Sequence, residues 1–290
     1  MLLFSKCMCC LVNQQERLIE QFEDEEKKSA FMREVMALLG SSRPEHNAPW
    51  MSALMTEIRE RYYGKNESIS KMKQEFNQLL LGMEPELVQE IRKSSDTLKE
   101  AIRFARIGNY IDFSAVEHVT KEEFMGLFHN EKDQLDEAEY RQLCQELSRA
   151  SQLLYIMDNC GEIVLDKIVI QELKKRYPKL HITAMVRGEE AINDATVEDA
   201  RLVGVMEEVP VLTNNSPIQG VIYHKLTEEG KHALDRADII LAKGQGNFES
   251  LYGCGRNIYY LFLCKCEMFS KRFGVGRFHG MFINEKRTPM

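Results

Sequence analysis

From residue 151 onward, short apolar runs alternate with segments of helical periodicity, and this alternation constrains the fold more than any other feature of the sequence. The apolar runs are LLYIMD (153–158), HITAMVR (181–187), DIILAKG (238–244), NIYYLFLCKC (257–266) and GMFINE (280–285). Helical patterns such as EIVLDKIVIQELKKRYP, TVEDARLVG, TEEGKHALDRA and EMFSKRFG lie between them. Short strands alternating with helices predict βαβ units and a mostly parallel sheet.

The first 150 residues have a different pattern, which is almost entirely helical. Apolar residues recur at helical spacing, and glycines mark where helices stop. The predicted helical stretches are 11–40, 49–64, 68–83, 85–108 and 120–151. We therefore expect a helical N-terminal region over residues 1–150 and an α/β domain over residues 151–290.

The composition indicates an ordinary globular protein, with 44% hydrophobic and 29% charged residues. A net charge of −7 disfavours nucleic acid as the main partner. No apolar run approaches the length of a membrane span, and the first residues do not form a secretory signal. The eight cysteines are therefore expected to be reduced thiols in a cytoplasmic protein.

Polar residues follow each predicted strand, at the place where ligands bind in parallel sheets. Asp158 and Asn159 follow the first strand, and Arg187 and Gly188 follow the second, with Asn193 and Asp194 opening the next helix. The later strand ends carry Lys243, Gly244, Asn247, Glu249 and Lys265.

These side chains predict a metal or phosphate site. Carboxylate and amide oxygens suit Mg²⁺ or Mn²⁺, and less specifically Ni²⁺ or Co²⁺. Lysines and backbone N–H groups suit a phosphate. Taken singly, Asp158–Asn159 would more often be a helix cap than a pair of ligands, Asn193–Asp194 is also suited to capping, and Lys243–Gly244 is compatible with a simple turn. The prediction rests on the same chemistry recurring at successive strand ends.

Other site classes lack their signatures. The sequence contains no Walker A spacing and no G-x-G-x-x-G after the first strand, which disfavours ATP, dinucleotide and methyl-donor binding. The histidines form no H-x-H or H-E-x-x-H pair, and no G-x-S-x-G elbow is present.

Six motifs, in order along the chain, resemble those of the DUF89 family (the damage-control phosphatase, ARMT1-like group), in particular its short stand-alone prokaryotic-type branch. They are CMCCLVNQ, GNYIDF, DNCGEIVLDK, VRGEEAINDATVEDA, AKGQGNFESL and CKCEMFSKRFGV. The resemblance implies a three-layer αβα, Rossmann-like fold. It also implies divalent-metal-dependent phosphatase activity on small phosphorylated metabolites, with Mn²⁺, Ni²⁺, Co²⁺ or Mg²⁺ as cofactor.

Carried over by motif, the resemblance implies Asp158, Asn159 and Asp194 as metal ligands. Lys265 would contact the phosphate. The remaining substrate contacts would come from the KGQGNFE loop (Asn247 and Glu249) and from GNYIDF (Asn109 and Asp112). The sequence departs from the family pattern at Cys160 and Glu267, beside proposed contacts rather than on them.

The predicted mechanism has the ion bridging the ester phosphate and a water, polarising the phosphoryl oxygens and lowering the pKa of that water. Lys243 and Lys265 would neutralise the equatorial oxygens, with Arg187 and Gly244 beside them. Asp158, Asp194 or Glu162 would orient the water or act as base, and direct attack on phosphorus by an aspartate is an open alternative. Sugar phosphates, nucleotides and phosphopantetheine-like compounds are all compatible substrates, and the oligomeric state is open.

Two alternatives remain at this stage. One is a protein carboxyl methyltransferase, an activity also ascribed to a relative in the family. The other is a non-catalytic ligand-binding or redox-sensing module that uses Cys7 and Cys10 as a redox pair or a second metal site. In their simplest interpretation these two cysteines are small core residues of an amphipathic helix.

Overall fold

The computed structural model describes residues 1–66, 68–110, 125–126, 128 and 134–288. Six of the strands in this part form one sheet in the order β3-β2-β1-β4-β5-β6. Neighbouring strands are parallel except for the antiparallel pair β5–β6. The strands are β1 (Gln152–Ile156), β2 (His181–Val186), β3 (Val211–Thr213), β4 (Ile239–Lys243), β5 (Ile258–Leu263) and β6 (Gly280–Asn284).

The strand order reverses between β1 and β4, which makes their shared carboxyl edge the switch point of a Rossmann-like sheet. The predicted mostly parallel α/β fold is thereby confirmed. Strand β3 is not predicted by the sequence pattern, because a strand of three residues after Pro210 leaves too short an apolar run to recognise.

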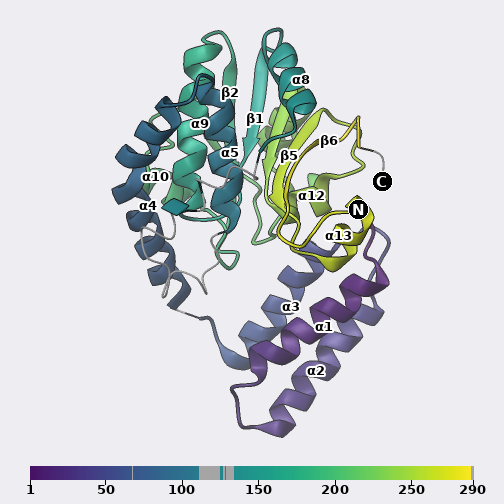
Figure 1. Cartoon of the computed structure of the whole chain (residues 1–290). Coiled ribbons are helices and arrows are strands. Elements are labelled where there is room, and N and C mark those ends of the chain that lie inside the picture. Colours follow the sequence, from purple (N-terminus) through teal and green to yellow (C-terminus); the bar gives the residue numbers. More distant parts are fainter. Residues whose placement is uncertain (67, 111–124, 127, 129–133, 289–290) are drawn as a thin grey trace.

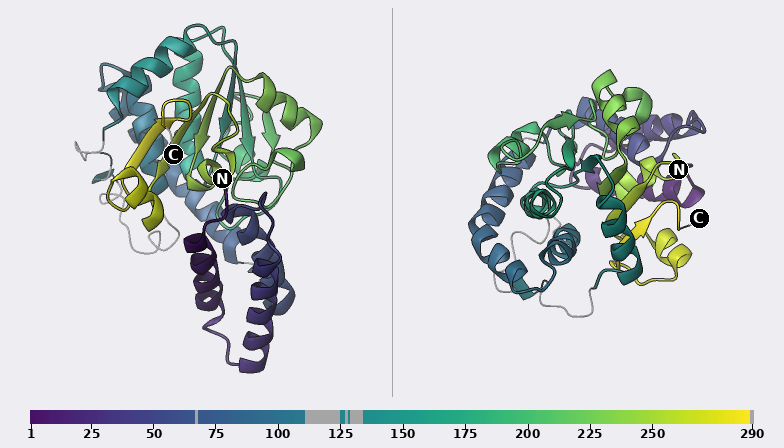
Figure 2. Two further views of the ribbon diagram at one scale, coloured as in Figure 1. Left: turned by 90° about the vertical axis from the view of Figure 1, so that its right-hand side faces the viewer. Right: turned by 90° about the horizontal axis from the view of Figure 1, so that it is seen from above.

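Helices cover both faces of the sheet and give the three layers that the resemblance implied (Figures 1 and 2). Alternate residues of β1 separate the two cores: Leu153 and Tyr155 face one, and Leu154 and Ile156 face the other. The first core includes α4 (Ser68–Arg92), α5 (Thr97–Ile107), α8 (Glu137–Leu147), α9 (Glu162–Arg176) and α10 (Val197–Leu202). The second includes α11 (Glu228–Arg236), α12 (Gln245–Leu251) and α13 (Glu267–Phe273).

Three N-terminal helices form a unit with a separate core and project from the sheet domain (Figures 1 and 2). They are α1 (Ser5–Ile19), α2 (Glu25–Gly40) and α3 (Ala48–Tyr63). Helix α3 packs against α12, and the Trp50 ring lies 5.1 Å from the ring of His224 in the short 3₁₀ helix η2 (Tyr223–Lys225). Helix α3 therefore contributes to the contact between this unit and the sheet domain.

The packing divides the predicted helical region. Helices α4 and α5 belong to the core of the sheet rather than to the core of α1–α3, and α5 packs closely on α9. Helices before residue 150 and strands after it share one core. The predicted domain boundary near residue 150 therefore stays a prediction.

Several predicted helical stretches differ from the structure. The stretch over 85–108 is divided between the end of α4 and α5, and the described end of the stretch over 120–151 is helical only in α8. The stretch over 11–40 is broken after Ile19, because Asp24 caps a new helix by accepting a hydrogen bond from the Lys27 N–H (2.9 Å). Helix α4 instead continues through Pro85, where the buried side chains of Leu87 and Ile91 keep its last turns on the core. Within the described residues, no helix is both long and apolar enough to cross a bilayer. The cytoplasmic location stays a prediction.

Phe248 joins α12 to the sheet, and its fully buried ring stacks on Phe262 at 4.8 Å between centroids. We predict that Phe248→Ala lowers the free energy of unfolding by about 3–5 kcal/mol, since it removes a buried ring and leaves a cavity. Urea unfolding measures the change. Leu79→Ala, at a 43% exposed position on α4, is the control and is expected to change stability by less than about 0.5 kcal/mol. Equal effects of the two substitutions would contradict the packing described here.

Candidate active site at the switch point

Strands β1 and β4 lie side by side at the switch point, and the residues that follow the two strands are in close contact. Gly244, directly after β4, has a φ of +79°, and a Cβ atom built there would lie 2.0 Å from Oδ2 of Asp158. Only glycine permits this approach, because it lacks a Cβ and adopts positive φ without strain. The predicted position Gly244 therefore makes room for the Asp158 carboxylate.

The loop after β2 completes the edge. Asn159 and Asp194 form an isolated antiparallel bridge, and the Ala195 N–H donates to the Asp158 carbonyl oxygen (2.7 Å). Ile192 in this loop has a φ of +51°. A β-branched residue with positive φ costs free energy, so the surrounding contacts hold the loop in a strained conformation. Strained backbone of this kind is common where side chains are positioned for function.

Three carboxylates, those of Asp158, Asp194 and Glu162, lie near enough at this edge to influence one another electrostatically. Burial, followed by the nearby Asp194 and Glu162 carboxylates, raises the pKa of Asp158 to about 8, against the opposing charges of Arg187 and Lys265. Two amides bridge the carboxylates: Asn109 Nδ2 and Asn159 Nδ2 each lie 2.9 Å from Asp158 Oδ2 and 2.9 Å from Glu162 Oε2. Asn109 comes from the 3₁₀ helix η1 (Gly108–Tyr110) that follows α5.

Lys243 lies under the edge rather than in a cavity wall. Its fully buried ammonium pairs with Glu162 and, at 2.8 Å, with Asp166. Burial alone would lower the pKa of Lys243, but Asp166 and Glu162 outweigh burial and raise it. Burial raises the pKa of Asp166 to about 6, while Lys243 opposes that rise. A buried cation requires such partners. Lys243 was predicted to contact the phosphate, but the structure places it beneath the cavity, paired with these two carboxylates.

Arg187 is also fully buried and away from the cavity. Its Nε donates to Asp194 Oδ2 (2.5 Å), its Nη1 donates to Asn247 Oδ1 (3.2 Å), and its Nη2 lies 3.6 Å from Asp158 Oδ1. Asn247 Nδ2 in turn donates to the Lys243 carbonyl oxygen (2.7 Å). Arg187 and Asn247 therefore fix the strand ends, where the prediction gave them substrate contacts.

A cavity of about 280 Å³ opens above these groups. Of the predicted site residues, five line it: Asn109, Asp158, Asn159, Glu249 and Lys265. The opposite wall comes from α1, from the start of α3, from the 193 and 219 loops, and from α12: Leu11, Gln14, Ala48, Pro49, Ser52, Asn193, Gln219, Gln245 and Gly246. The predicted residue Asp112 lies outside the described residues.

Lys265 supplies a positive charge to the lining of this cavity. No carboxylate in the described part of the chain forms an ion pair with it, and its backbone N–H donates to Gln245 Oε1 (3.0 Å). Its ammonium therefore remains available to an anion in the same space that Asp158 faces.

The donors at the edge fit a hard divalent cation. Asp158 and Asp194 supply carboxylate oxygens, and each oxygen has two lone pairs, so accepting a hydrogen bond leaves it able to ligate. The repulsion that helps raise the pKa of Asp158 is what a cation would relieve. In the described residues, no three Asp, Glu, His or Cys side chains form a metal-holding group. One or two carboxylates completed by water and phosphate are nevertheless the usual environment of Mg²⁺.

Two contributors had no signal in the sequence reading. Gln219 lines the cavity and donates to Asp194 Oδ1 (2.8 Å). Asn77, fully buried on α4, accepts a hydrogen bond from the Gly161 N–H (2.6 Å) and donates to Asp199 Oδ1 (2.7 Å). Asp199 also pairs with the buried Lys73 at 2.8 Å. Because both residues are distant in sequence from the groups that they contact, no local motif marks them.

The N-terminal cysteines lie on α1, with Cys7 half-buried and Cys10 exposed. All eight cysteines are free thiols. Burial, with the Glu249 carboxylate nearby, raises the pKa of Cys7 to about 11. Reactive thiols have lowered pKa values, so this environment disfavours a redox role for Cys7.

The fold and the edge define an α/β protein with a polar, charge-lined cavity at the switch point of a Rossmann-like sheet. Comparison with known proteins gives the family: the damage-control phosphatase ARMT1-like domain matches residues 3–279. The chain belongs to this family, and the resemblance to DUF89 proteins is confirmed.

Individual relatives cover nearly the whole chain. A damage-control phosphatase of Archaeoglobus fulgidus is 34% identical, over 91% of this chain and 89% of its own length. A damage-control phosphatase of Pyrococcus horikoshii is 29% identical, over 93% of each chain. The crystal structure of a DUF89 family protein from Pyrococcus horikoshii superposes with a TM-score of 0.82 at 26% identity, covering 98% of this chain and 99% of that one.

We predict that Asn77→Ala lowers the free energy of unfolding by about 1–3 kcal/mol, because it leaves the buried Gly161 N–H and part of Asp199 without partners. Gly161 has a φ of +69° and directly precedes Glu162, so the turn after Asp158 and Asn159 loses its anchor. Urea unfolding measures the change. The neighbouring exposed amide gives the control, since Gln78→Ala is expected to stay within about 0.5 kcal/mol. A loss no larger than the control's would show that Asn77 anchors nothing.

Glu249 gives a pH-dependent prediction. Burial raises its pKa from 4.5 to about 7, against the opposing hydrogen bond from Gln245. A carboxyl with a raised pKa binds its proton more tightly in the folded state, so its contribution to stability falls as pH rises from about 4.5 to about 7.

We therefore predict that Glu249→Gln is more stable than the wild type at pH 8, by on the order of 1–3 kcal/mol, and that the difference disappears near pH 4.5. Urea unfolding of both proteins at several pH values measures it. A difference that does not vary with pH would be the contrary result.

Proposed function

We propose that this chain is a metal-dependent phosphatase that hydrolyses phosphate monoesters of small metabolites in metabolite damage control. The observation that carries the proposal is the switch-point cavity, which Asp158 and Lys265 line together. Oxygen ligands and an available ammonium around one space of this size are what a metal and a phosphate need. Membership of the damage-control phosphatase family supports the same reaction.

Asp158, Asn159 and Asp194 are the residues that would hold the metal, and Mn²⁺, Ni²⁺, Co²⁺ and Mg²⁺ all suit these oxygens. When bound, the ion would polarise the phosphoryl oxygens and lower the pKa of a water. Asp194 is fixed for this role by hydrogen bonds to both of its carboxylate oxygens, from Arg187 and Gln219.

The protein's own groups have separate tasks in the proposed reaction. Lys265 neutralises charge on the phosphoryl oxygens, where phosphoryl transfer requires it. Asp158, the carboxylate that lines the cavity, orients the attacking water and accepts its proton. Glu162 lies outside the cavity lining and positions Asn109 and Asn159, which hold Asp158 in place.

The test is an assay of the chelator-treated protein against sugar phosphates, nucleotides and phosphopantetheine-like esters, with each of the four metals added back in turn. We predict metal-dependent release of phosphate, and a fall of at least about 100-fold in kcat/KM for Asp158→Asn. Asp24→Asn is the matched control: it makes the same chemical change at a helix N-cap, where asparagine is equally suited, and should leave kcat/KM unchanged. Undiminished activity of Asp158→Asn would refute the proposed role of this carboxylate.

A further inference from the structure

A second and larger cavity, of about 680 Å³, adjoins the one that contains Asp158. Ser52 and Gln219 line both cavities, so the two spaces are neighbours across these side chains. Gln219 also donates to Asp194, which ties the boundary between the cavities to the proposed metal site. The alcohol part of a phosphate ester held at Lys265 therefore has this larger cavity within reach.

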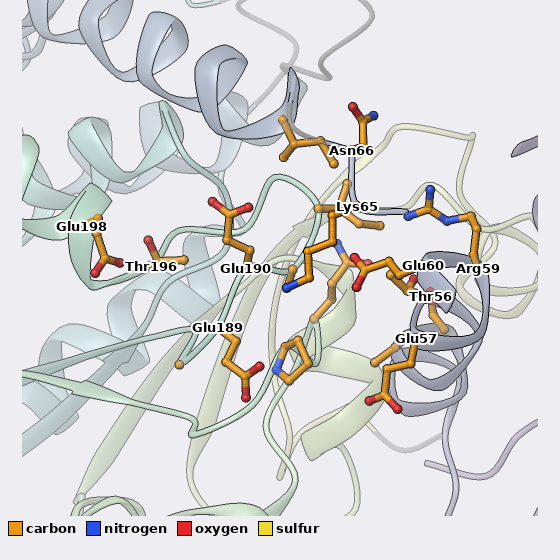
Figure 3. Close-up of a pocket in the computed structure, with 18 residues that line it drawn as sticks. Thr56, Glu57, Arg59, Glu60, Lys65, Asn66, Glu189, Glu190, Thr196 and Glu198 are labelled. Atoms are coloured by element: carbon orange, nitrogen blue, oxygen red, sulfur yellow. The ribbon is translucent and has the colours of Figure 1, made fainter. Parts of the chain in front are cut away.

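The larger cavity lies between the N-terminal helical unit and the loop after β2. Figure 3 shows Glu57 and Glu60 of α3 on one side and Glu189 and Glu190 of the loop on the other, with the Lys65 side chain reaching between them. Glu198 of α10 extends the loop side (Figure 3). The walls thus come from two parts of the chain that are distant in sequence.

The charge of this cavity is strongly one-sided. Five glutamates line it against two cations, Arg59 and Lys65, which is a net formal charge of −3. None of the five glutamates is ion-paired within the part of the chain that the structure describes, and the two cations of the lining offset only part of their charge. The smaller cavity beside it presents Lys265 together with Asp158 and Glu249. An anion is therefore favoured beside Lys265 in the smaller cavity, and a cation beside the glutamates of the larger one.

The residues that line the larger cavity also distinguish between the possible substrate classes, which are sugar phosphates, nucleotides and phosphopantetheine-like compounds. Among the described residues that line the larger cavity, none is aromatic, so it offers no ring on which a nucleobase could stack. A nucleoside diphosphate or a bisphosphate would place additional negative charge beside the unpaired glutamates. Like charges at close range disfavour binding.

We propose that the larger cavity binds the alcohol part of the substrate and selects phosphate monoesters whose body carries a positively charged amine. This inference rests on the proposed phosphatase function and deepens it. The ammonium of such a substrate would lie among Glu57, Glu60, Glu189 and Glu190, and its phosphate at Lys265. Glu189 and Glu190 determine specificity and take no part in the hydrolysis.

The experiment compares matched esters in the metal-loaded enzyme. Glucosamine 6-phosphate and glucose 6-phosphate differ by an ammonium in place of one hydroxyl, as do phosphoethanolamine and 2-hydroxyethyl phosphate. We expect kcat/KM to favour the amine of each pair by about tenfold at low salt, and we expect that ratio to fall as ionic strength increases.

Two variants should shift the ratio in opposite directions. Glu189→Gln combined with Glu190→Gln should bring the ratio close to one, whereas Lys65→Gln makes the cavity more negative and should raise it. Glu25→Gln, in the first turn of α2, is the control that leaves the ratio unchanged. A general loss of stability would not produce opposite shifts.

Two failures are distinguishable. If the esters are hydrolysed but wild type shows no preference for the amines, or if the cavity variants do not move the ratio, the inference is overturned and the phosphatase function stands. Hydrolysis of no ester with any of the four metals would overturn the proposed function, and this inference with it.

Discussion

A lysine ammonium with no exposure to solvent lies beneath the carboxyl edge of the sheet, and the arrangement of the site depends on how its charge is compensated. Lys243 ends β4 and pairs with Glu162 and Asp166 of α9, the helix that follows β1. A buried cation without partners would cost several kcal/mol. This pairing therefore joins the two strands on either side of the switch point and fixes the helix whose first residue is Glu162.

The network of charged and polar groups around Lys243 extends to the cavity. Glu162 accepts hydrogen bonds from Asn109 and Asn159, and the same amides hold Asp158. Arg187 performs the equivalent task for Asp194. Asp158 and Asp194 are thus held close together despite their mutual repulsion, which is the condition for binding a divalent cation. The buried layer of charges sets the chemistry, while helix α3 and the loop after β2 form the walls beside it.

Much of the fold and the place of the site could be predicted from sequence. Apolar runs such as HITAMVR and DIILAKG marked buried parallel strands, and parallel strands bring their carboxyl ends to one edge. Asp158, Asn159 and Lys265 were found in this way. The prediction did not separate residues that face the cavity from those beneath it. Lys243 and Arg187 are paired below the cavity with partners that include Glu162, which is 81 residues from Lys243.

The residues that the sequence reading missed share one property: they act across long sequence separations. Asn77 reaches Gly161 from α4, and Gln219 reaches Asp194 from a loop with no motif of its own. A single amide in a helix or loop has no periodicity or spacing that marks it. The short strand β3 was missed for a similar reason, since three residues carry too little pattern.

The proposed function requires that the switch-point edge bind a divalent cation through Asp158 and Asp194. A crystal soaked with Mn²⁺, with the ion located by its anomalous scattering, tests this binding. We expect one strong peak about 2.1 Å from oxygens of Asp158 and Asp194, facing the cavity lined by Lys265. A peak elsewhere, for example at Cys7 and Cys10, with no ion at this edge, would contradict it.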